Sequence, residues 1–328
     1  MGLLADPEYV TSEVVDWIPS GFPHMDTIFG GRGWPVGRVV ELFGQEGSGK
    51  SALAHRAIAE CQKQGGDALL LDYEAVTDKA QLLGVGVDSN RLIWGLPDTM
   101  EEGWDYIDTI AEARIGKEDC PPFVVVWDSL AMSPTAAEMT SNVETVSAQA
   151  RVVSARMRRA AKKVQRARIL LIFVNQIREQ IRTGMRSFGD HSVTPTGKAV
   201  KFAATIRVDC RIAKQIKLSD RTVGLLVKSS TPKNKLAPPH QATYWALSFE
   251  GHQGASLALT ACYVLQAAGK LRATRGKFVF RGEVDGDAYD YSLSRADWFR
   301  MFAEDAQFCK IATSVYVATV CGWKPTYT

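Results

Sequence analysis

The sequence lacks any hydrophobic run that is long enough to cross a membrane. A spanning helix needs roughly 18 or more consecutive apolar residues, and no stretch of the chain approaches this length. No signal peptide is recognisable at its start. The six cysteines lie far apart and form no C-x-x-C pair, which argues against a zinc site and a disulfide framework. These absences favour a cytoplasmic protein with no membrane partner.

An excess of charge of one sign is also missing. The formal net charge is only +3, so any binding to nucleic acid would have to come from local basic clusters. The sequence shows no internal repeat and no low-complexity tract. With 328 residues, of which 46% are hydrophobic and 23% charged, the chain is typical of a globular protein with one large domain and a smaller one.

The sequence does contain a phosphate-binding P-loop, G-x-x-x-x-G-K-[ST], at residues 44–51. Residues 38–43 predict a strand before it, and residues 51–64 predict an amphipathic helix after it. Such a turn directs backbone N–H groups at an anion, so a chance glycine-rich turn is the weaker explanation. We expect ATP and Mg²⁺ here, with Lys50 reaching the β- and γ-phosphates and Ser51 binding the metal ion. The candidate nucleotide-binding residues are Gly44, Gln45, Glu46, Gly47, Ser48, Gly49, Lys50 and Ser51.

Two acidic residues end apolar runs. Residues 123–129 are typical of a strand in a parallel sheet that is covered on both faces, and the run includes Asp128. After a P-loop this is the Walker B pattern, in which Asp128 supports Mg²⁺ through water. Residues 68–74 end in Glu74, which can orient the water that attacks the γ-phosphate. The alternatives are a capping role for Asp128 and a solvated strand end for Glu74.

A one-sided basic helix is predicted over residues 150–168. The segment has eight Lys and Arg residues and no acidic residue, with apolar residues at helical spacing. A solvated face is the ordinary explanation of a charged helix. This bias exceeds what solubility needs, and it favours contacts with phosphates.

The apolar residues 169–176 predict another buried strand, which ends in Gln176. A polar side chain at the carboxyl end of such a strand faces the ligand crevice, so Gln176 is a candidate γ-phosphate sensor; a turn-capping amide is the alternative. Residues 177–196 have no clear period and mix basic with apolar side chains, which suits a loop that contacts a nucleic-acid backbone and its bases. The candidate DNA-binding residues in and after this loop are Arg178, Arg182, Arg186, Phe188, Lys198 and Lys201.

The later part of the chain changes character. Residues 203–212, 224–230 and 242–249 predict strands that extend the sheet in antiparallel fashion. A basic, proline-stiffened turn over residues 231–239 carries Lys233 and Lys235, for which a solvated turn is the ordinary explanation.

After Gly251 we expect a helix over residues 255–268, a basic hairpin over residues 269–282 and mainly helix over residues 293–320. We therefore divide the chain into three parts. They are a short N-terminal segment 1–20 that is a candidate subunit contact, a core 21–254 and a small C-terminal domain 255–328.

Seven segments between residues 20 and 251 carry a family resemblance. They are SGFPHMDTIFGG, GRVVELFGQEGSGKS, LLDYEAVTD, VVVWDSLA, LLIFVNQIREQI, TGKAVKF and PKNKLAPPHQATY. In these segments the chain resembles the RecA family of homologous-recombination ATPases. The Asn-Gln-Ile-Arg and Lys-Asn-Lys-x-Ala-Pro elements are much more specific than a P-loop. The resemblance implies an α/β fold with a RecA-like P-loop ATPase core, in which helices flank a mostly parallel twisted sheet with an antiparallel extension, and a small α+β C-terminal domain.

The resemblance also implies a role for each matching residue. Lys50 and Ser51 would hold phosphate and Mg²⁺, Glu74 would activate water, and Gln176 would relay ATP occupancy to the following loop. Lys233 and Lys235 would act in trans, because two cations can neutralise charge that develops on the γ-phosphoryl group of a neighbouring subunit.

Further roles concern adenine, the metal ion and DNA. Asp78 is the expected adenine contact, and Asp128 would support the metal. The DNA-binding loops would be residues 133–147 and 177–197. Arg151 and Arg158 match residues that contact single-stranded DNA, and Lys201 matches better than Lys198.

These features together predict a DNA-dependent ATPase that forms a helical filament on single-stranded DNA and exchanges strands with homologous double-stranded DNA. A ring-forming helicase with the same fold and an accessory ATP- and DNA-binding protein are the alternatives. Only 43 residues precede Gly44, so we expect a reduced N-terminal packing element. The C-terminal part is closer to the phage UvsX type, which leads us to expect a bacterial or phage-infected cell as the source.

Overall fold

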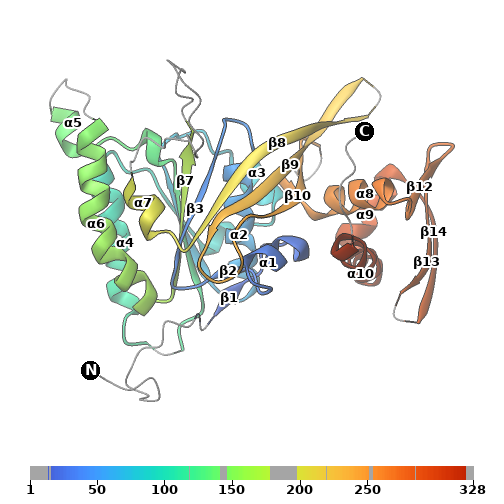
Figure 1. Ribbon diagram of the computed structural model, residues 1–328, viewed down its shortest axis with the longest axis horizontal. Helices are drawn as coiled ribbons and strands as arrows, with labels where there is room; N and C mark the ends of the chain where they lie inside the picture. Colours follow the sequence, from blue (N-terminus) through green and yellow to red (C-terminus); the bar gives the residue numbers. More distant parts are fainter. Residues whose placement is uncertain are drawn as a thin grey trace.

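The computed structural model describes residues 14, 16–117, 119–140, 146–177, 198–218, 220–250, 254–284 and 286–322. A large sheet with helices on both faces forms most of the molecule, and a smaller group of helices and strands lies at one end (Figure 1). Within the described residues the large sheet has nine strands, in the order β11-β10-β9-β8-β3-β7-β6-β4-β5. The predicted α/β fold is confirmed.

Six neighbouring strands of this sheet run parallel, from β8 to β5. They are β3 (Val39–Gly44), β4 (Asp67–Asp72), β5 (Leu92–Gly95), β6 (Phe123–Asp128), β7 (Ile169–Gln176) and β8 (Ile206–Leu218). The apolar residues of the four central strands β3, β7, β6 and β4 are buried on both faces, as parallel strands covered by helices require. The edge strand β5 and the second half of β8 are more exposed. The predicted antiparallel extension follows as β9 (Arg221–Asn234), β10 (Gln241–Ser248) and β11 (Gly254–Ser256).

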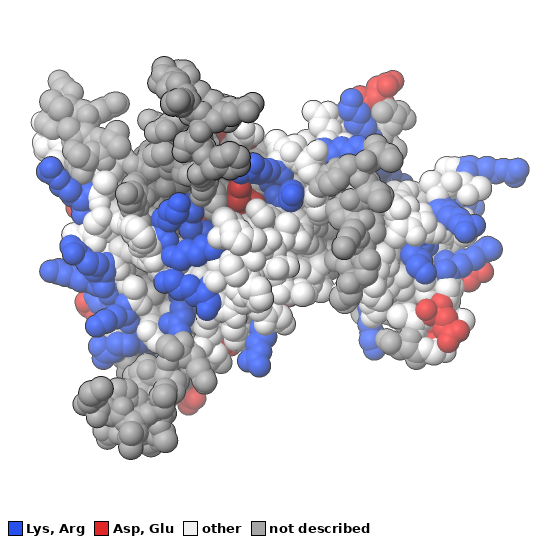
Figure 2. Space-filling model, in the orientation of Figure 1, with Lys and Arg blue, Asp and Glu red and all other residues white. Residues whose placement is uncertain are grey.

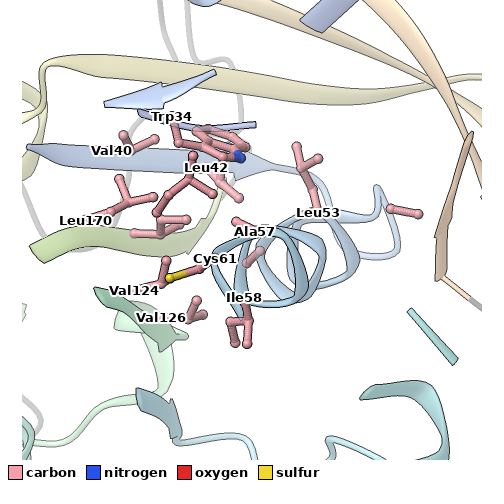
Figure 3. Packing of buried hydrophobic residues seen from close by; sticks show 14 of the residues in the cluster. Trp34, Val40, Leu42, Leu53, Ala57, Ile58, Cys61, Val124, Val126 and Leu170 are labelled. Carbon is pink, nitrogen blue, oxygen red and sulfur yellow. The ribbon is translucent and has the colours of Figure 1, made fainter. Parts of the chain in front are cut away.

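Alternate residues of the strands pack against different helices. Val40 and Leu42 of β3 join Leu53 and Ala57 of α2 (Lys50–Lys63) in one core (Figure 3). Val39 points to the opposite face and belongs to a second core. That core is shared with α4 (Met100–Arg114), α6 (Val146–Arg166) and α7 (Lys198–Ala203). The two cores hold the P-loop strand rigidly between helices.

Short elements complete the part of the molecule that contains the large sheet. They are β1 (Trp17–Ile18), α1 (Pro23–Phe29), β2 (Trp34–Pro35), α3 (Lys79–Gly84) and α5 (Ala136–Thr140). β1 pairs with β2 in a separate antiparallel ribbon. Thr99 caps the start of α4, because its Oγ1 accepts from the Glu102 N–H at 3.3 Å; the Glu102 carboxylate in turn accepts from the N–H of Asp98, the residue before the cap, at 3.0 Å.

The C-terminal elements have a hydrophobic core of their own. A three-stranded antiparallel sheet packs with three helices around Phe280, Trp298 and Phe308. The elements are α8 (Leu257–Ala267), β12 (Leu271–Thr274), β13 (Lys277–Val284), β14 (Asp287–Ser294), α9 (Arg295–Glu304) and α10 (Ala306–Gly322). The hydroxyl of Tyr316 on α10 is hydrogen-bonded to the ring of His24 on α1. This contact joins the C-terminal elements to the part of the molecule that contains the large sheet.

One prediction for the sheet was wrong. The basic turn expected at residues 231–239 begins later, because β9 continues to Asn234. Pro232 is tolerated there since the pairing of β8 and β9 shifts register between Arg207 and Asp209, as at a β-bulge. Lys233 therefore lies in a strand opposite Arg207, and the turn follows it. Among the described residues no helix has the length and apolar content of a membrane span.

Candidate nucleotide site and nucleic-acid interface

The P-loop joins the end of β3 to the first residue of α2. Gly49 has φ +82°, and a Cβ atom there would lie 2.7 Å from Cη2 of Trp245 on β10. Gly47 has φ +69° with no atom within 4 Å of such a Cβ. The backbone of the loop is therefore left-handed at Gly47 and Gly49, which favours glycine at both positions, and Gly49 packs directly on Trp245.

Lys50 begins α2, and its ammonium group is turned back onto the loop. Lys50 Nζ donates to the carbonyl oxygen of Gln45 at 2.7 Å, and the Ser48 hydroxyl donates to the same oxygen at 2.7 Å. Burial lowers the pKa of Lys50, while nearby acidic groups that include Asp128 and Glu74 oppose the shift. The cation is thus held by a backbone carbonyl, which it can leave when a phosphate enters the loop.

Asp128 ends β6 beside the first turn of α2. Its side chain is buried, and the Ser51 hydroxyl is hydrogen-bonded to its carboxylate. Burial raises the pKa of Asp128 to about 6, and repulsion from Glu74 and Asp72 adds to the effect. A hydroxyl and a carboxylate are hard oxygen donors of the kind that Mg²⁺ prefers. Ser51 and Asp128 therefore fit the predicted metal site, where a cation would offset the cost of the buried charge.

Glu74 lies two residues after the end of β4 and contacts residues at the ends of two other strands. Its Oε1 atom accepts hydrogen bonds from Ser129 Oγ at 2.7 Å and from Gln176 Nε2 at 3.2 Å. The backbone before the side chain is fixed because the Asp72 carboxylate accepts from the Glu74 N–H at 3.2 Å. Two predicted residues, Glu74 and Gln176, are thus brought together. Ser129 was missed, although its position directly after Asp128 is a signal that places it at the same edge.

Asp78 has a local structural role. Its carboxylate accepts from the Ala80 N–H at 2.9 Å and caps α3, and the residue is exposed. This role explains an aspartate here without any ligand. The contact between Asp78 and adenine stays a prediction.

The basic residues of the 150–168 segment divide into two groups. One group makes ion pairs: Arg156 lies 3.3 Å from Asp105 and from Asp108 on α4, and Lys163 lies 2.7 Å from Asp108. Arg168 pairs with Asp16 at 2.9 Å. The ion-paired residues tie α6 and the turn after it to the rest of the protein.

The second group is exposed and lies along one face of α6. Its spacing of seven, eight, eleven and fifteen residues from the first member keeps all members on one side of a helix with 3.6 residues per turn. The members are Arg151, Arg158, Arg159, Lys162 and Arg166. Figure 2 shows Lys and Arg side chains gathered along the edge of the molecule that α6 forms, at left. We call these five residues the basic face; it includes both α6 residues predicted to contact DNA.

The predicted DNA-binding loops lie partly outside the described residues. Arg178, Arg182, Arg186 and Phe188 are outside them, as is the side chain of Lys198. The ends of the longer loop are placed, because Gln176 ends β7 and Lys201 lies in α7. Of residues 133–147, the structure describes 133–140, which include α5, and residues 146 and 147, which begin α6.

The two lysines predicted to act in trans lie in different surroundings. Lys233 Nζ donates to the carbonyl oxygens of Lys201 and Phe202 at 2.6 and 2.9 Å, in the last turn of α7. Burial lowers the pKa of Lys233 to about 8, and the charges of Lys235 and Arg207 add to the shift. Lys235 is exposed. Within one chain Lys233 is already engaged, whereas the side chain of Lys235 is accessible to a neighbour.

Comparison with known proteins places this arrangement in a family. The family described as the RecA N-terminal domain matches residues 5–253. This chain belongs to the RecA N-terminal domain family. The predicted family is thereby confirmed, together with the fold of a RecA-like ATPase core; the phage-type subgroup stays a prediction.

Proteins named RecA from several bacteria are similar to this RecA-family chain. A relative from Lactobacillus delbrueckii is 39% identical over 227 residues, which cover 69% of this chain and 66% of the relative. A relative from Ureaplasma parvum is 35% identical over 241 residues, covering 73% and 70% of the two chains. One from Enterococcus hirae is 39% identical over 229 residues, covering 69% and 63%. The matches span 59 to 66% of the length of three Lactobacillus relatives.

Proposed function

We propose that this chain is a DNA-dependent ATPase that forms a helical filament on single-stranded DNA and catalyses homologous pairing and strand exchange. The contact between Glu74 and Gln176 carries the proposal. It joins the residue suited to activate water to the strand end that leads into the predicted DNA loop. Nucleotide state and the grip on DNA would then depend on one hydrogen bond.

The P-loop would hold the nucleotide, and Lys50 would offset the negative charge of its phosphates. Ser51 and Asp128 would hold Mg²⁺, which when bound supplies positive charge to the β- and γ-phosphates. Lys50 would exchange the Gln45 carbonyl for a phosphate oxygen. Because Lys50 is buried, its attraction for a phosphate is screened less than that of a surface lysine.

Glu74 is suited to act as the general base of hydrolysis. Its carboxylate would orient a water molecule and accept a proton from it as the water attacks the γ-phosphate. Gln176 would leave Glu74 and donate its amide N–H to the γ-phosphate instead. Ser129 would continue to hold Glu74 through the 2.7 Å hydrogen bond and so keep the base in place.

A second subunit would complete the site. Lys235 is exposed on the turn after β9, so it can reach a nucleotide held by a neighbouring copy of the chain. Lys233 would join it only by leaving the carbonyls of α7. Cations supplied in this way stabilise charge in the transition state of phosphoryl transfer, as an arginine finger does.

The partner of the basic face would be a nucleic-acid backbone. Fifteen residues of helix separate Arg151 from Arg166, which is about 22 Å at 1.5 Å per residue and so spans several phosphates. Phosphate contacts carry no sequence information, so the choice of sequence would come from base pairing between strands. The basic face and the predicted loops would hold single-stranded DNA.

The C-terminal part would be a separate small domain that collects double-stranded DNA. Its own hydrophobic core supports a boundary near residue 255. The hairpin of β12 and β13 carries Lys270, Arg272, Arg275 and Lys277 on its exposed side, while Arg281 is paired with Asp290 at 2.6 Å.

The rate of ATP hydrolysis, with and without single-stranded DNA and over a range of protein concentrations, tests the proposal. We expect strong stimulation that rises cooperatively with protein concentration, because the site would be completed between subunits on DNA. Hydrolysis that is indifferent to DNA at every concentration would contradict the proposal and favour an accessory role. Rings in electron micrographs, in place of filaments, would favour a helicase.

A further inference from the structure

A row of polar side chains crosses four adjacent strands of the large sheet. Asn175 on β7 donates from Nδ2 to Oε1 of Glu41 on β3 at 3.0 Å. Arg207 on β8 donates from Nε to the other carboxylate oxygen of Glu41 at 2.5 Å. Lys233 on β9 lies directly opposite Arg207 in the strand pairing. We call Asn175, Glu41, Arg207 and Lys233 the polar row.

The centre of the polar row is fully buried. Glu41 and Asn175 are 0% exposed, and Arg207 is 2% exposed. The Arg207 guanidinium lies 4.2 Å from the ring centre of Phe43, which is the residue directly before the P-loop. Glu41 is two residues after Val39 in β3, so both side chains lie on the sheet face that α7 covers. A buried ion pair can often be replaced by apolar residues without loss of stability, so stability alone does not explain this one.

Both ends of the polar row meet the chain on either side of the predicted DNA loop. Asn175 precedes Gln176, whose amide is hydrogen-bonded to Glu74. Lys233 is bonded to two carbonyl oxygens in the last turn of α7, the helix that begins at Lys198. The chain between Gln176 and α7 is the predicted loop. The row thus connects the residue where the loop starts to the helix where it ends.

We infer that Glu41 and Arg207 are positioning residues that couple the nucleotide site to both ends of the DNA loop. The inference rests on the proposed function for the meaning of the loop. Glu41 shares one carboxylate between Asn175 and Arg207, so a shift of the β7 end disturbs the Arg207 contact. Arg207 and Lys233 are like charges in opposed positions, and Glu41 offsets one of them. A displaced Arg207 therefore changes the hold of Lys233 on α7.

The test removes the charges while retaining the fold. Glu41→Gln alone leaves a buried arginine uncompensated, so a loss of activity in this variant would not separate positioning from misfolding. The informative protein is the full chain with Glu41→Leu and Arg207→Met together, which replaces the pair by apolar side chains of similar size. The matched control is Asp67→Asn with Arg91→Met, which removes a pair at the opposite end of β4 from Glu74.

Three quantities separate a positioning role from a structural one. They are the melting temperature, the affinity for a fluorescent ATP analogue, and the hydrogen exchange of the α7 amides with and without a non-hydrolysable ATP analogue. We expect the apolar pair to melt within a few degrees of the parent and to bind the analogue within threefold. We expect the analogue to protect α7 at least tenfold in the parent and in the control, and less than twofold in the apolar pair.

The same proteins are then assayed for stimulation of hydrolysis by single-stranded DNA, which should fall at least tenfold in the apolar pair alone. An apolar pair that folds, binds nucleotide and keeps both responses within twofold of the parent overturns the inference. The inference is also overturned if hydrogen exchange of the α7 amides in the parent protein does not change when the ATP analogue binds. A parent that protects α7 but shows no DNA stimulation instead removes the proposed function, because the exchange measurement needs neither DNA nor hydrolysis.

Discussion

Replacing Asp128 by Asn should stabilise the nucleotide-free protein and abolish its response to magnesium. The pKa of Asp128 is raised from 3.8 to about 6 because the carboxyl is buried. A difference of about two pKa units corresponds to roughly 3 kcal/mol of unfavourable free energy for the ionised form in the folded state. Asparagine keeps an oxygen that can accept from Ser51 but carries no charge.

The sign of the pH dependence follows from this shift. The folded protein takes up the Asp128 proton near pH 6, whereas the unfolded chain takes it up near pH 4, so this group destabilises the fold fully above pH 6 and less as the pH falls. We expect Asp128→Asn to raise the free energy of unfolding by about 1 to 3 kcal/mol at pH 7.5. The gain should shrink by about half at pH 5 and nearly vanish at pH 4.

Thermal unfolding of the two proteins over this pH range, with and without Mg²⁺ and an ATP analogue, is the assay. At a nucleotide concentration of 100 times Kd the parent should gain about 2.7 kcal/mol, and Asp128→Asn should gain little when magnesium is added. Binding of magnesium and the ATP analogue would therefore cancel most or all of the stability advantage that Asp128→Asn has without ligand. A variant that is less stable than the parent at pH 7.5 without ligand refutes the argument from burial. A variant that keeps the full magnesium-dependent gain removes Asp128 from the metal site.

Other substitutions test the remaining parts of the site. Glu74→Gln should retain ATP and DNA binding but lose at least a hundredfold in the rate of hydrolysis, since the amide cannot accept the proton; unchanged turnover would remove Glu74 from its role. Lys233→Ala and Lys235→Ala should depress DNA-stimulated hydrolysis only where protomers touch, and equal loss in a demonstrably monomeric preparation would refute action in trans. Lys162→Ala should lower the slope of log affinity against log salt for single-stranded DNA by about 0.7; an unchanged slope would place Lys162 off the DNA path.

The matched control for the last substitution is Lys163→Ala. Lys163 neighbours Lys162 in the sequence but is bonded to Asp108 and Glu112 on α4 at 2.7 and 2.9 Å. Its removal should weaken the contact between α6 and α4 slightly and leave the salt slope unchanged. A larger effect from Lys163 than from Lys162 would contradict the division of α6 into an ion-paired side and the basic face.

The P-loop and its surroundings could be placed from sequence because the signals are local. A glycine turn between an apolar strand and an amphipathic helix needs no distant partner to be recognised, and β3 and α2 lie where they were expected. The order of the strands in the sheet could not be predicted from such local signals. The contact between Glu74 and Gln176 depends on β4, β6 and β7 lying side by side, which is a property of the whole sheet.

The polar row is an example of a feature that could not be predicted from the sequence. Glu41 is a single acidic residue within an apolar strand, and its partner Arg207 is 166 residues away in the sequence. Strand β14 was missed for a different reason. Its alternation is present in the sequence but was not recognised: Tyr289, Tyr291 and Leu293 pack in the C-terminal core, whereas Asp290 and Ser292 between them are exposed. The late end of β9 was missed because Pro232 and Asn234 are residues typical of turns.

Strand exchange between circular single-stranded DNA and a linear duplex tests the central claim most directly. With ATP and magnesium, we expect the protein to form joint molecules with a homologous duplex and none with a heterologous duplex of equal length. Protein that coats single-stranded DNA and hydrolyses ATP, yet forms no joint molecules with the homologous duplex, would contradict the account.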